Sequence, residues 1–152
     1  MASVNDVDDK ESMAQPRPRA IFVVGASSVG KTTLCRALAK EFGIDQSKHI
    51  QEIARHVMRT QGFSRETVHQ YAMQHAIMSA QLVAEGAILG HANTHDRVLL
   101  LSDRSAVDPI VYAMTSNVEN KAENAAKLLH DTSFQSILPF YRESLFGMCR
   151  MC

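Results

Sequence analysis

Two short, almost wholly apolar runs stand out in the chain, residues 20–25 (AIFVVG) and residues 98–102 (VLLLS). Neither run alternates between apolar and polar positions, and Gly25 ends the first while Asp103 follows the second. Continuous apolar runs of this length are typical of strands buried on both faces, as in parallel sheets. Residues 47–51 (SKHIQ) are a weaker candidate for another strand.

The first apolar run is followed by apolar residues at helical spacing. Residues 31–42 place Leu34, Leu38 and Phe42 four positions apart, immediately before Gly43. This pattern predicts an amphipathic helix that ends at a glycine.

A short helix is then expected over residues 52–60, and a long one over residues 65–89 with Ser64 as its N-cap. One face of the long helix follows the three-four spacing of apolar positions, and we expect this face to pack on the core. Its residues are Val68, Tyr71, Ala72, His75, Ser79, Leu82, Val83 and Gly86.

Only helices are expected after the second apolar run. Asp108 and Pro109 have the pattern of an N-cap and a first helical residue. Further helices are expected over residues 118–130 and 133–146, with Pro139 interrupting the second. Strands that alternate with helices predict an α/β fold with a parallel sheet and right-handed crossovers. The first strand would then have an open edge.

The sequence divides into three parts. Residues 1–18 are polar and acidic and end in a proline-containing stretch, so we expect a disordered segment. Residues 19–146 form the predicted domain, and residues 147–152 are expected to be an irregular tail.

Composition narrows the function classes. The chain has 152 residues, 45% of them hydrophobic and 21% charged, and a formal net charge of zero. We therefore expect no nucleic-acid partner, because no global basic field is present. No apolar run is long enough for a transmembrane segment, and no secretory or transit pattern begins the chain. With only three cysteines, these features predict a cytoplasmic protein.

The strongest motif directly follows the first strand. Residues 25–32 (GASSVGKT) match G-x-x-x-x-G-K-S/T, the P-loop pattern, between a predicted strand and a predicted helix. Its glycines bring backbone N–H groups close to phosphate oxygens, and the helix N-terminus adds positive potential. The motif predicts binding of ATP or GTP with Mg²⁺, Lys31 reaching the phosphates and Thr32 binding the metal. The predicted nucleotide-binding residues are Gly25, Ser27, Ser28, Val29, Gly30, Lys31, Thr32 and Thr33.

Asp103 and Arg104 follow the second strand. A carboxylate at this position can hold Mg²⁺ directly or through water, although it could instead cap the next helix. The guanidinium of Arg104 can neutralise charge that develops during phosphoryl transfer, or it can form a surface ion pair. We predict Lys31, Glu52, Asp103 and Arg104 as catalytic residues, and Thr32 and Asp103 as metal ligands.

Glu52 and Arg55 lie just beyond the weak strand candidate, near the edge where open α/β sheets bind ligands. Glu52 could accept a proton from an acceptor hydroxyl, with Arg55 orienting it. The alternative is a helical salt bridge between the two. Gln74 and Gln81 share one side of the long helix and could bind a base or an amide, or they could be exposed helix residues.

Three sequence segments and the long glutamine-containing helix together resemble a known family. The segments are GASSVGKTTL (25–34), QEIARHVMR (51–59) and VLLLSDRSAVDPIVYA (98–113). The combination is similar to the NadR-like AAA-type P-loop domain. That family is named after the ribosylnicotinamide kinase domain of NadR and includes the TRPL translocation defect proteins.

The resemblance implies a P-loop NTPase three-layer sandwich with a parallel sheet. It also implies nucleotide contacts at Gly25, Gly30, Lys31 and Thr32, magnesium at Thr32 and Asp103, and site roles for Glu52, Arg55, Arg104 and Asp108. Such folds usually have strands on both sides of the P-loop strand, followed by a basic lid. Since we predict neither late strands nor a lid here, we expect an incomplete, C-terminally truncated domain.

Three functions follow as hypotheses. The first is a Mg²⁺-dependent kinase that transfers the γ-phosphoryl group of ATP or GTP to a small hydroxylated metabolite, such as a nucleoside or riboside. The second is a nucleotide-dependent binding module or switch that recognises a protein or a phosphoinositide. The third is a catalytically incomplete product that still binds nucleotide. Fold-family membership does not choose between them.

Overall fold

In the computed structural model, which describes residues 20–93, 95–96 and 98–149, parallel strands form one four-stranded sheet in the order β2-β3-β1-β4. The strands are β1 (Ala20–Val24), β2 (His49–Ile50), β3 (Leu100–Asp103) and β4 (Leu145–Met148). β1 and β3 pair with Val23 opposite Asp103. The carboxyl end of β3 therefore lies beside the start of the P-loop segment.

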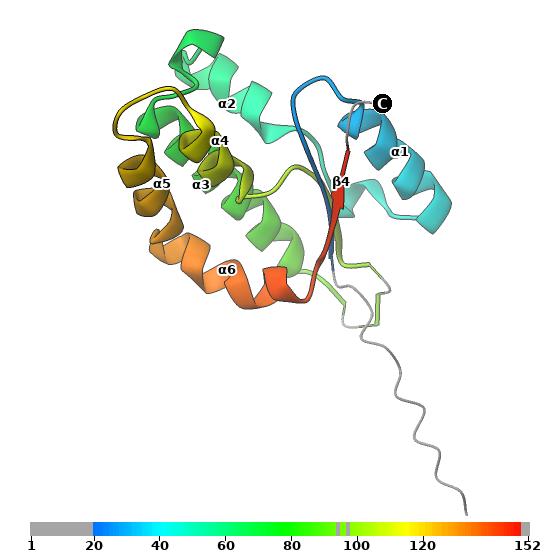
Figure 1. Cartoon of the computed structure of the whole chain (residues 1–152). Coiled ribbons are helices and arrows are strands. Elements are labelled where there is room, and N and C mark those ends of the chain that lie inside the picture. Colours follow the sequence, from blue (N-terminus) through cyan, green and yellow to red (C-terminus); the bar gives the residue numbers. More distant parts are fainter. Residues whose placement is uncertain (1–19, 94, 97, 150–152) are drawn as a thin grey trace, which may run out of the picture.

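Helices cover both faces of the sheet unequally. They are α1 (Lys31–Phe42), α2 (Ile53–Gln61), α3 (Tyr71–Leu89), α4 (Asp108–Thr115), α5 (Lys121–Leu129) and α6 (Thr132–Arg142), with short 3-10 helices at Gln46–Lys48 and Arg65–Thr67. Figure 1 shows α1 on one side of the strands and α3 to α6 on the other. This confirms the predicted α/β fold with a parallel sheet between helical layers.

Alternating residues of β1 supply two separate cores, because successive side chains of a strand point to opposite faces. Phe22, fully buried, joins the larger core with residues of α3, α5 and α6. Ile21 and Val23 face α1, where they pack with the buried Cys35. Both faces of β1 are thus apolar, which explains the continuous apolar run in the sequence.

The prediction that no strand follows β3 was wrong. The final predicted helix ends earlier, at Arg142, with Pro139 inside it, and β4 then pairs in parallel with β1. The Phe146 ring stacks on Phe22 at 5.0 Å between centroids and meets Tyr141 edge-on at 5.7 Å. The contact with Phe22, which is distant in sequence, helps to hold Phe146 in a strand although the local pattern predicted a helix there.

β4 changes two further expectations. Because β4 and β3 flank β1, the P-loop strand has no open edge, contrary to our prediction. Gly147 and Met148 belong to the strand and not to an irregular tail. Residues 150–152 of that predicted tail, and the segment 1–18 that we expected to be disordered, lie outside the described residues.

The buried face of the long helix was also predicted wrongly. Ser64 caps the short 3-10 helix Arg65–Thr67, and α3 begins only at Tyr71. Val83, which we placed on the core face, is 73% exposed. The buried residues of α3 are Met73, Gln74, Ile77, Met78, Gln81 and Glu85. Apolar residues occur all around this helix, so spacing alone did not distinguish the two faces.

Smaller differences concern element ends. The N-cap of α4 is Val107, and Asp108 is the first residue of the helix. The Asp108 carboxylate accepts from the Ser105 N–H at 2.8 Å.

In the part of the chain that the structure describes, no helix combines the length and apolar character needed to cross a membrane.

Candidate functional site

The loop between β1 and α1 depends on two glycines with positive φ. Gly25 has φ +142° and Gly30, the N-cap of α1, has φ +87°. A Cβ at Gly25 would lie 2.5 Å from the carbonyl oxygen of Cys149, far inside van der Waals contact. Conformation and space therefore both require glycine at this position.

Lys31 is the first residue of α1 and is only 5% exposed. Its Nζ donates to the carbonyl oxygen of Ala26, within the same loop. Burial lowers the pKa of Lys31, and the nearby charge of Arg104 lowers it further, while Asp103 opposes both effects. The lysine cation is thus held inside the loop that the motif predicted to surround phosphates.

Thr32 and Asp103 meet although they are far apart in sequence. Thr32 Oγ1 donates to Asp103 Oδ2 at 2.6 Å, and Asp103 is 1% exposed. The other carboxylate oxygen, Oδ1, is buried and has no hydrogen-bond partner among the described residues. Hard oxygen donors such as a hydroxyl and a carboxylate suit Mg²⁺, which commonly takes one or two protein ligands and completes its shell with phosphate oxygens and water. The residues present therefore fit the ion that the motif implies.

Arg104 occupies a strained position beside this pair. Its φ is +83°, in a region that side chains other than glycine rarely adopt, and it is 7% exposed. Nε lies 3.7 Å from Glu52 Oε1, and Nη1 lies 3.5 Å from Asp108 Oδ1. Nη1 also donates to the Tyr112 hydroxyl at 3.3 Å. The hypothesis of a surface ion pair is therefore wrong: the guanidinium is buried between two carboxylates.

Glu52, the N-cap of α2, lies next to Arg104, whereas Arg55 is a residue of α2 itself. Glu52 Oε2 lies 3.3 Å from Arg55 Nη2, so the helical salt bridge exists, but the Arg55 side chain is 81% exposed. The other Glu52 oxygen, Oε1, faces Arg104, and the charge of Glu52 raises the pKa of Lys31 against the lowering effect of burial. Glu52 is therefore part of the P-loop's electrostatic environment, whereas Arg55 points to solvent.

A model of the family described as AAA domain matches residues 20–139 of the chain. The chain belongs to this AAA domain family. No curated protein matches the sequence. An AAA domain with a P-loop binds nucleotide, usually with Mg²⁺, so the match supports the coarse function that the motif predicted. It does not distinguish ATP from GTP.

Neither role considered for Gln74 and Gln81 in this AAA domain, binding of a base or amide or exposure on the helix surface, fits the structure. Gln74 and Gln81 are each 2% exposed, so neither is a solvent-facing helix residue. Gln74 Nε2 donates to the Val68 carbonyl oxygen at 2.5 Å, and Gln81 Nε2 donates to Glu85 and Ser102. Their polar groups are engaged inside the protein and do not face a base or an amide of a ligand.

Two residues near the AAA domain's P-loop were missed by sequence reasoning. Tyr112 is one helical turn after Asp108 on α4, and that spacing could have suggested it. Cys149 had no local signal: its N–H donates to the Val24 carbonyl at 2.9 Å and its Sγ–H to the Val29 carbonyl at 3.0 Å. The residue after β4 therefore supports both ends of the P-loop.

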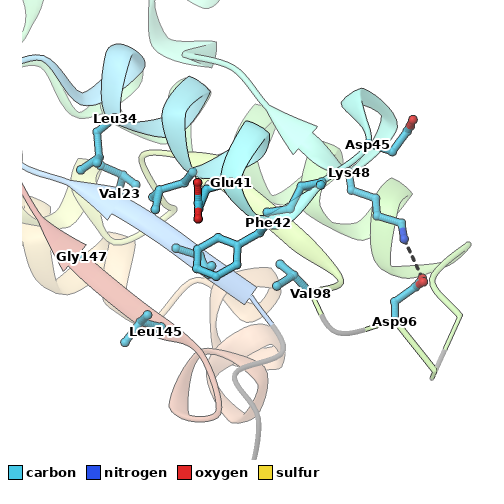
Figure 2. Close-up of a pocket in the computed structure, with 14 residues that line it drawn as sticks. Val23, Leu34, Glu41, Phe42, Asp45, Lys48, Asp96, Val98, Leu145 and Gly147 are labelled. Atoms are coloured by element: carbon cyan, nitrogen blue, oxygen red, sulfur yellow. Dashed lines mark ion pairs between the residues drawn. The ribbon is translucent and has the colours of Figure 1, made fainter.

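A groove of about 710 Å³ lies elsewhere, between α1 and the β1–β4 side of the sheet. Figure 2 shows Phe42, Val98 and Leu145 around it, with the Lys48–Asp96 ion pair at one end. Its lining includes neither Lys31 nor Asp103. A second cavity, of about 600 Å³, is lined by Glu52 and by His49, Ile50, His56 and Ala84, among others. Of these two cavities, the smaller one is lined by one predicted catalytic residue, Glu52.

Proposed function

We propose that this AAA domain is a kinase that transfers the γ-phosphoryl group of ATP or GTP to a hydroxyl of a small metabolite, a nucleoside or riboside. The observation that carries the proposal is one cluster at the carboxyl edge of the sheet. It joins the P-loop residues Lys31 and Thr32 to Asp103, Arg104 and Glu52. A loop that only binds nucleotide would need neither the second carboxylate, Glu52, nor the buried guanidinium of Arg104.

On the nucleotide side, the loop N–H groups and the N-terminus of α1 would face the phosphates. Lys31 would exchange its bond to the Ala26 carbonyl for phosphate oxygens, a favourable exchange because phosphate is charged. Thr32 and Asp103 would hold Mg²⁺, the latter through its unpartnered Oδ1. The metal, when bound, neutralises negative charge on the phosphates.

On the acceptor side, Glu52 would receive the proton of the attacking hydroxyl. The hydroxyl oxygen forms a bond to the γ-phosphorus, the bond from that phosphorus to the bridging oxygen breaks, and nucleoside diphosphate leaves. The Glu52 side chain is 23% exposed and lines the 600 Å³ cavity, so an acceptor can approach it. Its position fits a general base.

Arg104 would stabilise charge that develops on the transferred group. Its Nε–H makes no hydrogen bond in the described part of the chain and faces Glu52 Oε1 at 3.7 Å. Ion pairs with Glu52 and Asp108 fix the guanidinium before ligand arrives. A fixed donor costs no reorganisation during the reaction, which is the main benefit of such preorganisation.

The test is a screen of the purified 152-residue chain with Mg²⁺ and ATP or GTP. Nucleosides and ribosides serve as acceptors, with release of nucleoside diphosphate and the mass of the product as readouts. Turnover of about 1 per second or above is the ordinary kinase range. Glu52→Gln should lower turnover about 100-fold or more and change nucleotide affinity by a much smaller factor.

A matched control is Glu123→Gln, which breaks the exposed ion pair with Lys127 on α5. It should change neither turnover nor affinity. Nucleotide binding without transfer to any acceptor would contradict the kinase proposal. Phosphoinositides or a protein that bind in a nucleotide-dependent way would then favour the switch hypothesis, and binding of nucleotide alone would favour a catalytically incomplete product.

A further inference from the structure

A hydrogen-bonded chain of buried polar groups runs from β3 through α3 and α6 and back to the segment after β3. Gln81 Nε2 donates to Ser102 Oγ and to Glu85 Oε1, both at 2.9 Å. The Tyr141 hydroxyl donates to Glu85, at 2.8 Å from Oε2 and 3.0 Å from Oε1. The same hydroxyl accepts from the Ala106 N–H at 3.0 Å. An amide has two protons and a hydroxyl can donate and accept, so all bonds can exist together.

Both ends of this chain are attached to one short segment, at the Ser102 hydroxyl and at the Ala106 backbone N–H. Ser102 precedes Asp103 and Arg104, and Ala106 follows them. The segment between the two attachments carries the carboxylate that meets Thr32 and the buried guanidinium. It also carries the positive φ of Arg104, a conformation that persists only where surrounding structure enforces it.

The network is deeply buried and contains a carboxylate without a cation. Glu85 is 0% exposed, Gln81 2% and Tyr141 5%. No ion pair to Glu85 occurs within the described residues, where its partners are Gln81 and Tyr141. Burial raises the pKa of Glu85 to about 7, against the opposing hydrogen bonds from these two partners. A carboxyl group in such surroundings is costly, and an apolar side chain would pack there without that cost.

We propose that Gln81, Glu85 and Tyr141 form a positioning network that holds the Asp103–Arg104 segment at both of its ends. Among the described residues, their hydrogen bonds go to one another, to Ser102 and to the Ala106 N–H, through which they act on the segment. Glu85 is the link, because it accepts from the two groups that reach the segment from opposite sides. The role in nucleotide binding rests on the proposed function, whereas the restraint on the backbone does not.

The experiment uses Tyr141→Phe, which removes the acceptor of the Ala106 N–H and the donor to Glu85 but keeps the ring contact with Phe22 at 5.0 Å. Gln81→Met is the second variant, because it releases the Ser102 end with little change in volume. Tyr71→Phe on α3 is the matched control, since that ring stacks on His75 and lies outside the network. Circular dichroism and a denaturation curve verify that each variant is folded.

Two readouts separate the network from the proposed function. The first is amide hydrogen exchange in the 152-residue chain without nucleotide, at the Arg104 N–H, which donates to the Val23 carbonyl at 2.9 Å. We expect exchange there to rise about threefold to tenfold in each network variant, the effect of one lost hydrogen bond, and to be unchanged in Tyr71→Phe. The second is affinity for Mg²⁺-ATP or Mg²⁺-GTP, which should weaken by a similar factor.

The outcomes are distinguishable. Faster exchange at Arg104 in both network variants, with weaker affinity, supports the whole proposal. Faster exchange with no nucleotide binding by the wild-type chain would refute the proposed function and leave the positioning network standing. In Tyr141→Phe the Ala106 N–H loses its acceptor, so faster exchange at that group alone is expected in any case. If exchange rises there and not at the Arg104 N–H, the proposal is overturned, because the network would then restrain nothing beyond its own bonds.

Discussion

Replacing Asp103 with asparagine separates the metal role of this carboxylate from a structural role. The side chain keeps its size and one oxygen that can accept from Thr32 Oγ1, now 2.6 Å from Oδ2. It loses the negative charge and one of two oxygens. Because Oδ1 has no hydrogen-bond partner among the described residues, the lost oxygen is the one that a metal ion would use.

The size of the effect follows from burial. Asp103 is 1% exposed, so salt and water screen its charge weakly. A contact to a charged group of this kind contributes about 1.5 to 3 kcal/mol, equal to about 10- to 100-fold in affinity. The free energy of unfolding without ligand should change by no more than about 1 kcal/mol, because removing a buried charge that forms no ion pair among the described residues offsets the loss of an acceptor.

The assay is titration of ATP and GTP in Mg²⁺ and again in a chelator. Asp103→Asn should weaken binding about 10- to 100-fold in Mg²⁺ and leave binding in chelator within about twofold. Asp131→Asn is the control, because Asp131 caps α6 through the Ser133 and Phe134 N–H groups, and asparagine caps equally well. Equal losses with and without Mg²⁺ would refute the reasoning.

Three further predictions use other parts of the site. Lys31→Ala should weaken triphosphate binding at least about 100-fold in the same titration without lowering the denaturation midpoint, because the lysine contributes a charge aimed at phosphate; unchanged affinity would contradict the P-loop assignment. Gly25→Ala should destabilise the fold by about 2 to 4 kcal/mol in urea, since φ is +142° and the new Cβ would lie 2.5 Å from Cys149. The control Gly43→Ala, with φ +61° and nothing within 4 Å, should cost less. Folding raises the pKa of Glu85 from 4.5 to about 7, so the folded protein retains a proton that the unfolded chain releases, and stability should fall as pH rises between these values. Glu85→Gln should remove this decrease, about 2.5 kcal/mol between urea curves at pH 5 and pH 8, and an unaltered pH dependence would argue against the buried carboxyl.

Local sequence patterns correctly predicted the elements and motifs that depend on only a few neighbouring residues. The P-loop motif, the helix Lys31–Phe42 and the strands β1 and β3 were all expected close to where they occur. Three such local patterns are a glycine that ends a helix, a lysine that follows a glycine, and an apolar run. Each can be recognised in the sequence without knowing which distant residues it contacts. Asp103 was predicted as a magnesium ligand together with Thr32 because it follows the second strand, and the two side chains do meet.

Contacts between distant segments decided the rest. β4 exists because Phe146 stacks on Phe22, a pairing that no local spacing reveals. The buried face of α3 carries Gln81 and Glu85 because Ser102 and Tyr141 satisfy their polar groups there. An amphipathic pattern counts apolar residues and treats such glutamines and glutamates as exposed, but a buried polar group is tolerated wherever the fold brings it a hydrogen-bond partner.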